Sequence, residues 1–136
     1  MVQINIVYEG KLHCSATHVP SGQTLGTDAP KDNQGQGETF SPTDLVATAL
    51  GACMLTIMGI VAQRQNLNLT GSTVTVMKEM TSQPTRRIGR LPVTVTVPTK
   101  LSEDDRRRLE NAVVTCPVHR SLHPEIEIPI AFKWGQ

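Results

Sequence analysis

The chain has 136 residues, of which 38% are hydrophobic but only 3% are aromatic. Thirteen basic and 12 acidic side chains leave a formal charge of +1, so the charge balance does not favour binding to nucleic acid or an anionic membrane. No apolar run looks long enough to span a membrane, and the N-terminal segment lacks the basic region of a signal peptide. We therefore expect a soluble cytoplasmic protein with a single domain over residues 1–136.

Three cysteines, Cys14, Cys53 and Cys116, lie far apart in the sequence. An odd number at wide spacing does not resemble the disulfide framework of a small secreted protein. In a reducing compartment such thiols are either buried fillers or groups that carry chemistry.

Apolar and polar residues alternate in the first third of the chain. This alternation predicts three short strands over residues 3–8, 12–18 and 23–28. Turn residues separate the segments, which favours an antiparallel meander. Residues 29–38 are polar, contain two glycines and show no periodicity, so we expect a loop there.

A long helix is predicted to follow this loop. Ser41 can cap it, Pro42 suits its first position, and Asp44 can bond back to the cap. The helical segment continues to Gln65, and residues 45–62 are apolar or small nearly all the way round. A helix of this kind must be buried on every side, which a chain of this size hardly achieves alone. The pattern therefore predicts a partner subunit.

The remaining elements complete an α+β fold. Alternation over residues 68–80 and 91–97, with a turn at 81–87, predicts a long hairpin. Ser102 and the acidic residues after it predict a second helix, with a buried stripe at Leu109, Ala112, Val113 and Cys116. Pro117 stops or kinks that helix. A last strand over residues 125–134 contains Pro129, which favours an edge or a bulge. The predicted order is β-β-β-α-β-β-α-β.

Two cysteines are candidates for chemistry, each with a structural alternative. Cys53 lies inside the long helix, where a free thiol often serves as a small hydrophobe. Gly51 is unusual in such a helix and would allow close approach of a backbone or a ligand. At Cys116, His119 and Arg120 follow within one turn and would favour a thiolate. They could equally bond the last carbonyls of the second helix.

Two groups of potential zinc ligands are close in sequence: His13, Cys14 and His18, and Cys116, His119 and His123. Alternation along a strand separates the first group between two faces. The second group has no C-x-x-C pair and matches no standard zinc spacing. We therefore predict no metal site and no cofactor, and structural zinc through Cys116 and His119 is kept as a minor hypothesis.

Residues 40–53 resemble the Pro-x-x-Leu-x-x-x-Ala-x-x-x-Cys helix of the OsmC/Ohr proteins (osmotically inducible protein C and organic hydroperoxide resistance protein). Pro42 and Cys53 stand at the two ends of that motif. The segment from Thr115 to His119 resembles the second Cys-Pro motif of the family. The resemblance implies an intertwined homodimer, with antiparallel sheets around two central helices and active sites at the subunit interface.

The resemblance also implies a reaction. Cys53 would be the peroxidatic thiolate that reduces an organic hydroperoxide, and Cys116 would be the resolving thiol. A dithiol such as a lipoyl group would then reduce the disulfide between them. Oxidative-stress defence is the corresponding role.

The sequence departs from the family pattern at two supporting positions. Thr43 stands where the studied peroxidases have a Glu, and Asp44 is one residue further on, which turns a helical side chain by about 100°. No Arg occurs before Arg64, so the usual cation is missing from the N-terminal strands. Glu38 could supply a carboxylate instead. The candidate cations are Lys11, Lys31 and Arg120.

Two functions therefore stay open at this point. The first is a thiol-dependent peroxidase that uses the Cys53 and Cys116 pair. The second is an OsmC-like protein that binds a small apolar or thiol-reactive ligand at the dimer interface without turnover. Missing Glu and Arg favour binding, whereas two cysteines at the matching positions favour the peroxidase.

Overall fold

The computed structural model describes all 136 residues and divides them into two compact units, Met1–Val46 and Ala47–Gln136. Each unit has its own sheets, and the long helix α1 (Pro42–Arg64) begins in the first and continues in the second. The predicted α+β class is confirmed. The assignment of one domain to residues 1–136 stays a prediction.

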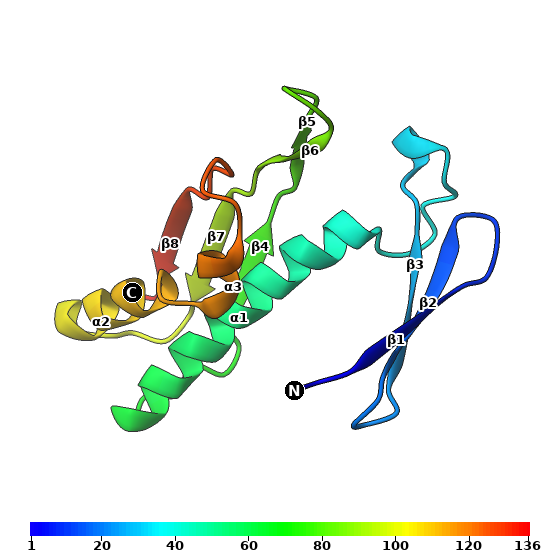
Figure 1. The fold of residues 1–136 in the computed structure, drawn as a ribbon. Helices are drawn as coiled ribbons and strands as arrows, with labels where there is room; N and C mark the ends of the chain where they lie inside the picture. The colour runs from blue at the N-terminus through cyan, green and yellow to red at the C-terminus, as the bar shows by residue number, and fades with distance from the viewer. The chain divides into compact units, whose positions relative to one another are not determined.

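The first unit is built on a three-stranded antiparallel meander, as the alternation predicts. The strands pair in the order β1-β2-β3 (Figure 1) and span Ile4–Tyr8, His13–His18 and Thr24–Asp28. Because side chains alternate along a strand, the register aligns Ile6, Ala16 and Leu25 on one face. Ile6 is 62% exposed and Leu25 is 48% exposed, so the first unit itself does not cover this apolar face.

The loop after β3 leads to the start of α1. It contains one short 3₁₀ turn, η1 (Lys31–Asn33), and is otherwise irregular. Its end confirms the predicted cap: Asp44 donates its backbone N–H to Ser41 Oγ at 3.0 Å, and Ser41 returns its own N–H to Asp44 Oδ2 at 2.9 Å. These reciprocal bonds set the first residue of the helix at Pro42.

Helix α1 ends at Arg64, one residue short of the prediction, and buries one side. The buried residues recur every three or four positions at Ala47, Leu50, Gly51, Met54, Met58 and Ala62.

By length and composition α1 could cross a membrane, so the expectation that no apolar run is long enough was wrong. The core helix of a soluble protein meets the same criterion. Only 33% of its most apolar window is buried.

Gly51 allows α1 to lie close to the strand β4 (Thr73–Val76). A Cβ atom at this position would stand 3.1 Å from Val76 Cγ2 and 3.2 Å from Val74 Cγ1. Contacts this short require the neighbouring side chains to move. The structure therefore explains the glycine by close packing of a strand on the helix, one of the alternatives that the sequence leaves open.

The two glycines of α1 make a testable pair. Gly51→Val is expected to lower the free energy of unfolding by about 1–3 kcal/mol, because the new side chain overpacks the contact with Val74 and Val76. A Cβ at Gly59 meets nothing within 4 Å. The matched variant Gly59→Val is therefore expected to change stability by less than about 0.5 kcal/mol. Urea unfolding followed by circular dichroism measures both, and equal losses would contradict this account.

The predicted hairpin is present but is divided into two ladders. Strand β4 pairs with β7 (Val93–Val97), and beyond them β5 (Glu79–Thr81) pairs with β6 (Arg87–Arg90). Pro92 separates β6 from β7 and has no N–H to donate, although its carbonyl accepts a bond from the N–H of Met77. The chain therefore has four strands here instead of the predicted two.

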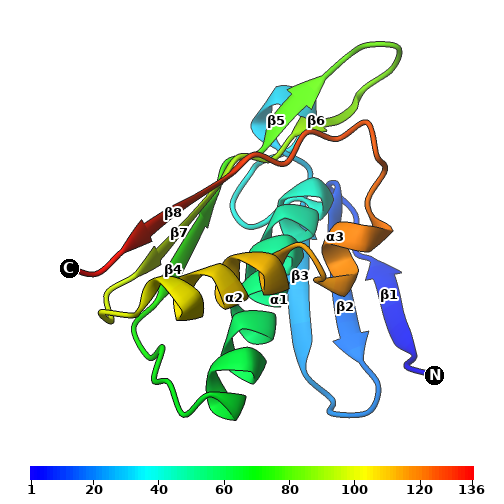
Figure 2. The same ribbon diagram turned by 90° about the vertical axis from the view of Figure 1, so that its left-hand side faces the viewer.

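The last strand corrects two predictions. β8 (Ile130–Trp134) begins directly after Pro129, whereas the alternation predicted a start at residue 125. It pairs in parallel with β7, giving the sheet order β4-β7-β8, so this sheet is not wholly antiparallel. The chain reaches β8 through helices, and such a crossover allows a parallel pairing. Its place at the edge of the sheet (Figure 2) agrees with the prediction from Pro129.

Two helices connect β7 to β8. Helix α2 (Glu103–Val113) is capped by Ser102, whose Oγ accepts the N–H of Asp105 at 3.2 Å. Its apolar stripe is buried as predicted at Leu109, Ala112 and Val113, but α2 ends at Val113, so Cys116 is buried outside this helix. Pro117 starts a separate short helix, α3 (Pro117–Ser121), so the chain turns at Cys116. The fully buried side chains of the second unit come from α1, α2, β7 and the segments beside them: Leu50, Met54, Met58, Leu91, Val93, Val95, Val97, Leu109, Val113 and Cys116.

Candidate functional site

The fold brings Cys53 and Cys116 together within the second unit. Cys53 lies about three turns into α1 and is half-buried, whereas Cys116 is fully buried between α2 and α3. Their thiols hydrogen-bond to each other. Both are reduced. A partly accessible sulfur is therefore in direct contact with a buried one, although the two residues are far apart in the sequence.

The surroundings of Cys116 keep its proton in place. Burial raises the pKa of the Cys116 thiol above its ordinary value, and the hydrogen bond with Cys53 raises that pKa further. The backbone N–H of His119, which donates to Cys116 Sγ at 3.4 Å, acts in the opposite direction on the pKa but is outweighed. Cys116 is therefore the member of the pair that stays protonated and donates the hydrogen bond to its neighbour.

His119 and Arg120 contact Cys116 through their peptide groups. Cys116 is the N-cap of α3, its sulfur accepts the N–H of His119, and its carbonyl accepts the N–H of Arg120 at 3.1 Å. Neither sequence alternative anticipated this arrangement, because both assumed that α2 ends at Cys116 without a new helix. Pro117 at the first helical position was the available signal.

The candidate carboxylates, Glu38 and Asp44, lie in the first unit. Asp44 and the supporting residue Thr43 both contact Ser41 at the start of α1. Asp44 belongs to the capping bonds with Ser41, and Thr43 Oγ1 lies 3.2 Å from Ser41 Oγ. Glu38 is exposed, and its backbone N–H donates to Asp28 Oδ2 at 3.1 Å. Asp44 therefore has a structural role at the start of α1.

The candidate cations come from different elements. Lys11 lies in the turn between β1 and β2 with a positive φ of 55°, and Lys31 begins η1. Arg120 lies in the last turn of α3, in the same unit as the two cysteines. Of the three candidate cations, only Arg120 lies in the second unit, on the short helix that Cys116 caps.

No group of three or more His, Cys, Asp and Glu side chains lies together in a way that could hold a metal ion. On β2, His13 faces Asp28 across the ladder, with Nδ1 2.6 Å from Asp28 Oδ1. From the sequence, His13 was considered only as a zinc ligand, so this pair was missed. No spacing rule identifies it, because Asp28 reaches His13 through strand pairing.

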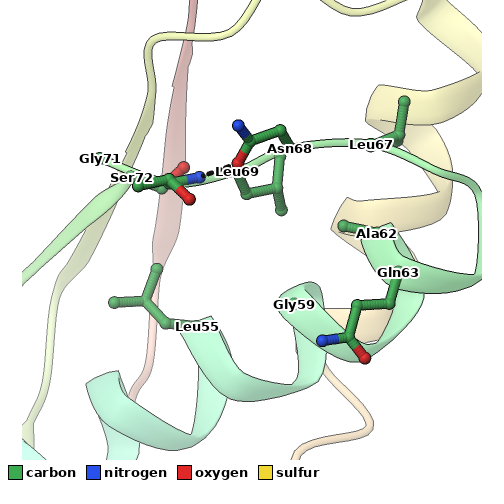
Figure 3. A pocket seen from close by; sticks show the side chains of 10 residues that line it. Leu55, Gly59, Ala62, Gln63, Leu67, Asn68, Leu69, Gly71 and Ser72 are labelled. Carbon is green, nitrogen blue, oxygen red and sulfur yellow. Dashed lines mark hydrogen bonds between the residues drawn. The ribbon is translucent and has the colours of Figure 1, made fainter.

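A hollow of about 390 Å³ opens beside the C-terminal half of α1 (Figure 3). Leu55 and Gly59 line it from the helix, and the loop of residues 67–72 lines it from the other side. Leu55 and Cys53 are two residues apart, so their side chains leave the helix about 200° apart. The hollow is therefore separate from the cysteine pair. A second glycine inside the predicted helix, Gly59, was the available sequence signal.

Comparisons with known proteins agree with this fold. Residues 35–131 match the family described as OsmC-like protein. A solved structure from Psychrobacter arcticus 273-4, a protein for which a role in osmotic stress and detoxification has been suggested, is 41% identical with a TM-score of 0.92. That alignment covers 97% of this chain and 96% of that one. No curated protein matches the chain.

Two more distant structures share the fold. An OsmC-like protein from Mycoplasma pneumoniae is 15% identical with a TM-score of 0.84, over 100% of this chain and 98% of that one. An organic hydroperoxide resistance protein OsmC from Legionella pneumophila is 15% identical with a TM-score of 0.79, over 98% and 96%. At such identity they establish similarity of fold alone.

Proposed function

Since the chain belongs to the OsmC-like protein family, we propose that it is a thiol-dependent peroxidase for organic hydroperoxides, with Cys53 as the attacking thiolate and Cys116 as the resolving thiol. The observation that carries the proposal is the hydrogen bond between the two thiols, one half-buried and one fully buried. The hydroperoxide-resistance function of the Legionella protein supports the substrate class.

The reaction has three steps. The Cys53 thiolate attacks the terminal oxygen of the hydroperoxide, so the O–O bond breaks, Cys53 becomes a sulfenic acid and the alkoxide takes a proton to leave as an alcohol. The sulfur of the Cys116 thiol then attacks Cys53 Sγ, and the Cys116 proton leaves with the sulfenic hydroxyl as water, which leaves a disulfide. An external dithiol, such as a lipoyl group, reduces this disulfide and is itself oxidised.

The arrangement of the two sulfurs suits this order. Cys53 has the access that a substrate needs, and Cys116 is fully buried. The pKa of Cys116 is raised, so it holds a proton that it can donate to the Cys53 sulfur. The Cys116 thiol thus offers a hydrogen bond to Cys53 Sγ in a chain that lacks the family's usual cation in its N-terminal strands.

A homodimer is part of the proposal. The meander presents an apolar face with Ile4, Ile6, Tyr8 and Leu25 all about half exposed or more. The outward side of α1 is also apolar. An exposed apolar area of this extent requires a cover, and a second copy of the chain is the partner that we propose. We also propose a cytoplasmic location, because three cysteines at wide spacing do not resemble the disulfide framework of a secreted protein.

The direct test is a free-thiol count before and after about one equivalent of cumene hydroperoxide. The wild type is expected to lose two thiols rapidly, and a peptide map should link Cys53 to Cys116. The variant Cys14→Ser is the matched control, because Cys14 is a half-buried cysteine on β2 with no part in the pair. It should lose the same two thiols. Unchanged thiols after many equivalents would contradict the proposal.

Ligand binding without turnover is the second candidate function. Two observations favour it: the hollow beside α1, lined by Leu55 and Leu69, and the residue Thr43 where the peroxidases carry a Glu. If the thiols stay reduced with hydroperoxide, this candidate replaces the first. A titration with decanol, read by tryptophan fluorescence and compared with Gly59→Leu, would then examine the hollow.

A further inference from the structure

We propose that His13 and Asp28 form a latch that holds the loop of residues 29–40 closed while His13 is protonated. The loop connects the last strand of the meander to the start of α1. Asp28 is the last residue of β3, directly before the loop, and His13 faces it from β2. This inference concerns the first unit alone and does not depend on the proposed peroxidase.

Asp28 joins the two ends of the loop. Its backbone N–H donates to the carbonyl of Phe40 at 3.0 Å, and its Oδ2 accepts the N–H of Glu38 at 3.1 Å. The remaining oxygen, Oδ1, lies 2.6 Å from His13 Nδ1. Asp28 is only 7% exposed, so a change in its one side-chain partner is poorly compensated by water. The Asp28 carboxylate thus adds a side-chain link from His13 to the end of the loop, beside the backbone bond to Phe40.

His13 is held in the position that this contact needs. Its ring lies over Gly26 of β3, where a Cβ atom would stand 3.0 Å from His13 Cε1 and 3.3 Å from Nε2. On its other side, Nε2 lies 3.3 Å from Glu9 Oε1. A glycine at residue 26 therefore leaves the room for an imidazole between two carboxylates. With both ring nitrogens next to an acceptor, the doubly protonated form fits this site best.

The rest of the loop is ordered by its own bonds. Gly37 donates its N–H to the carbonyl of Ala29 at 3.2 Å, and Gly35 donates to Pro30 at 2.9 Å. A Cβ at Gly35 would overlap the Ala29 carbonyl, so this tight course requires a glycine. The loop is therefore compact, and its two ends lie close together.

The direction of the pH dependence follows from the charges around His13. The hydrogen bond to Asp28 is the largest cause that raises the His13 pKa above 6.5, partial desolvation lowers it, and the charges of Asp28, Glu9 and Glu38 raise it. A raised pKa in the folded state means that the stabilisation is fully present below about pH 6.5 and is lost as the pH rises through the folded-state pKa. Above the folded-state pKa the His13 ring is neutral, so the carboxylates of Asp28, Glu9 and Glu38 no longer attract a positive charge.

Amide hydrogen exchange of residues 29–40 tests the latch, measured from about pH 5.5 to about pH 9 and corrected for the intrinsic exchange rate. In the wild type, protection of this segment is expected to fall roughly three- to tenfold as the pH rises, since a charge-assisted bond becomes a neutral one. Protection of α2 should not change. If the corrected protection of residues 29–40 in the wild type does not change with pH, the latch is overturned.

His13→Asn is the informative variant, because an amide places a neutral donor near the position of Nδ1 but cannot be charged. It is expected to show the lower protection at every pH. His18→Asn is the matched control on the same strand, where Nδ1 contacts only Ser21 Oγ, and it should behave like the wild type. Retention of the pH dependence in His13→Asn would also overturn the proposal. In parallel, an NMR titration of the His13 ring should give a pKa above 6.5, and a value below 6.5 counts against it.

Discussion

Cys53→Ser is expected to abolish the consumption of organic hydroperoxide, with a loss on the order of 10³-fold or more, because the variant has no nucleophile for the O–O bond. The serine is nearly isosteric, so the helix packing around Leu50 and Met54 should be kept. Steady-state assays with cumene hydroperoxide and dihydrolipoamide measure the loss. Circular dichroism verifies that the variant is folded.

The partner variant separates the two roles. Cys116→Ser is expected to consume about one equivalent of hydroperoxide and then stop, because the sulfenic acid on Cys53 finds no resolving thiol. Dimedone labelling followed by mass spectrometry should locate that sulfenic acid on Cys53. Labelling of Cys116 in the reverse variant would exchange the proposed roles. Full activity in both single variants would exclude the pair as the catalytic centre.

Ile6→Asp is expected to dissociate the proposed homodimer into monomers. Ile6 stands at the centre of the apolar face of the meander, next to Ala16 of β2 and 62% exposed within the chain. A carboxylate buried at a subunit interface without a partner costs several kcal/mol, which is comparable with the whole binding energy of a moderate dimer. Sedimentation velocity of wild type and variant at equal concentration measures the shift to monomer.

Val7 provides the matched control for this experiment. It is the next residue on β1, is 61% exposed, and points to the opposite face of the sheet. Val7→Asp is expected to leave the sedimentation coefficient unchanged. Equal dissociation by both variants would indicate unfolding of the meander, and a monomeric wild type would remove the dimer from the proposal.

Local signals predicted most of the secondary structure. The alternation of β1 to β3, the capping residues Ser41 and Ser102, and the buried stripe of α2 each depend on neighbours within a few positions of the sequence. Such patterns are readable because the periods of strands and helices are determined by backbone geometry. The same holds for Pro129, which predicted an edge position for the last strand.

The errors arose where the chain interacts over longer distances. Three features were missed: the division of the predicted hairpin at Pro92, the parallel pairing of β8 with β7, and the new helix at Pro117. Each lies at or directly after a proline, and tertiary packing decides which structure the chain adopts there. A proline indicates an interruption, but only the surrounding elements decide which structure the chain adopts after it. The apolar run of α1 was misjudged for a different reason: scattered small residues conceal its continuous hydropathy, which the sequence alone determines.

For the candidate site, the sequence by itself determined which side chains are available. Cys53 was placed on a buried helix and Cys116 at the end of another, and the motif resemblance suggested that they act together. Only the tertiary structure decided that their thiols touch, that Cys116 is the buried member, and that His119 reaches it through a peptide N–H. The pairing of His13 with Asp28 is also tertiary, because strand register joins residues that no local period relates. Periodicity specifies which face a residue takes, whereas contact between distant residues depends on how the faces pack.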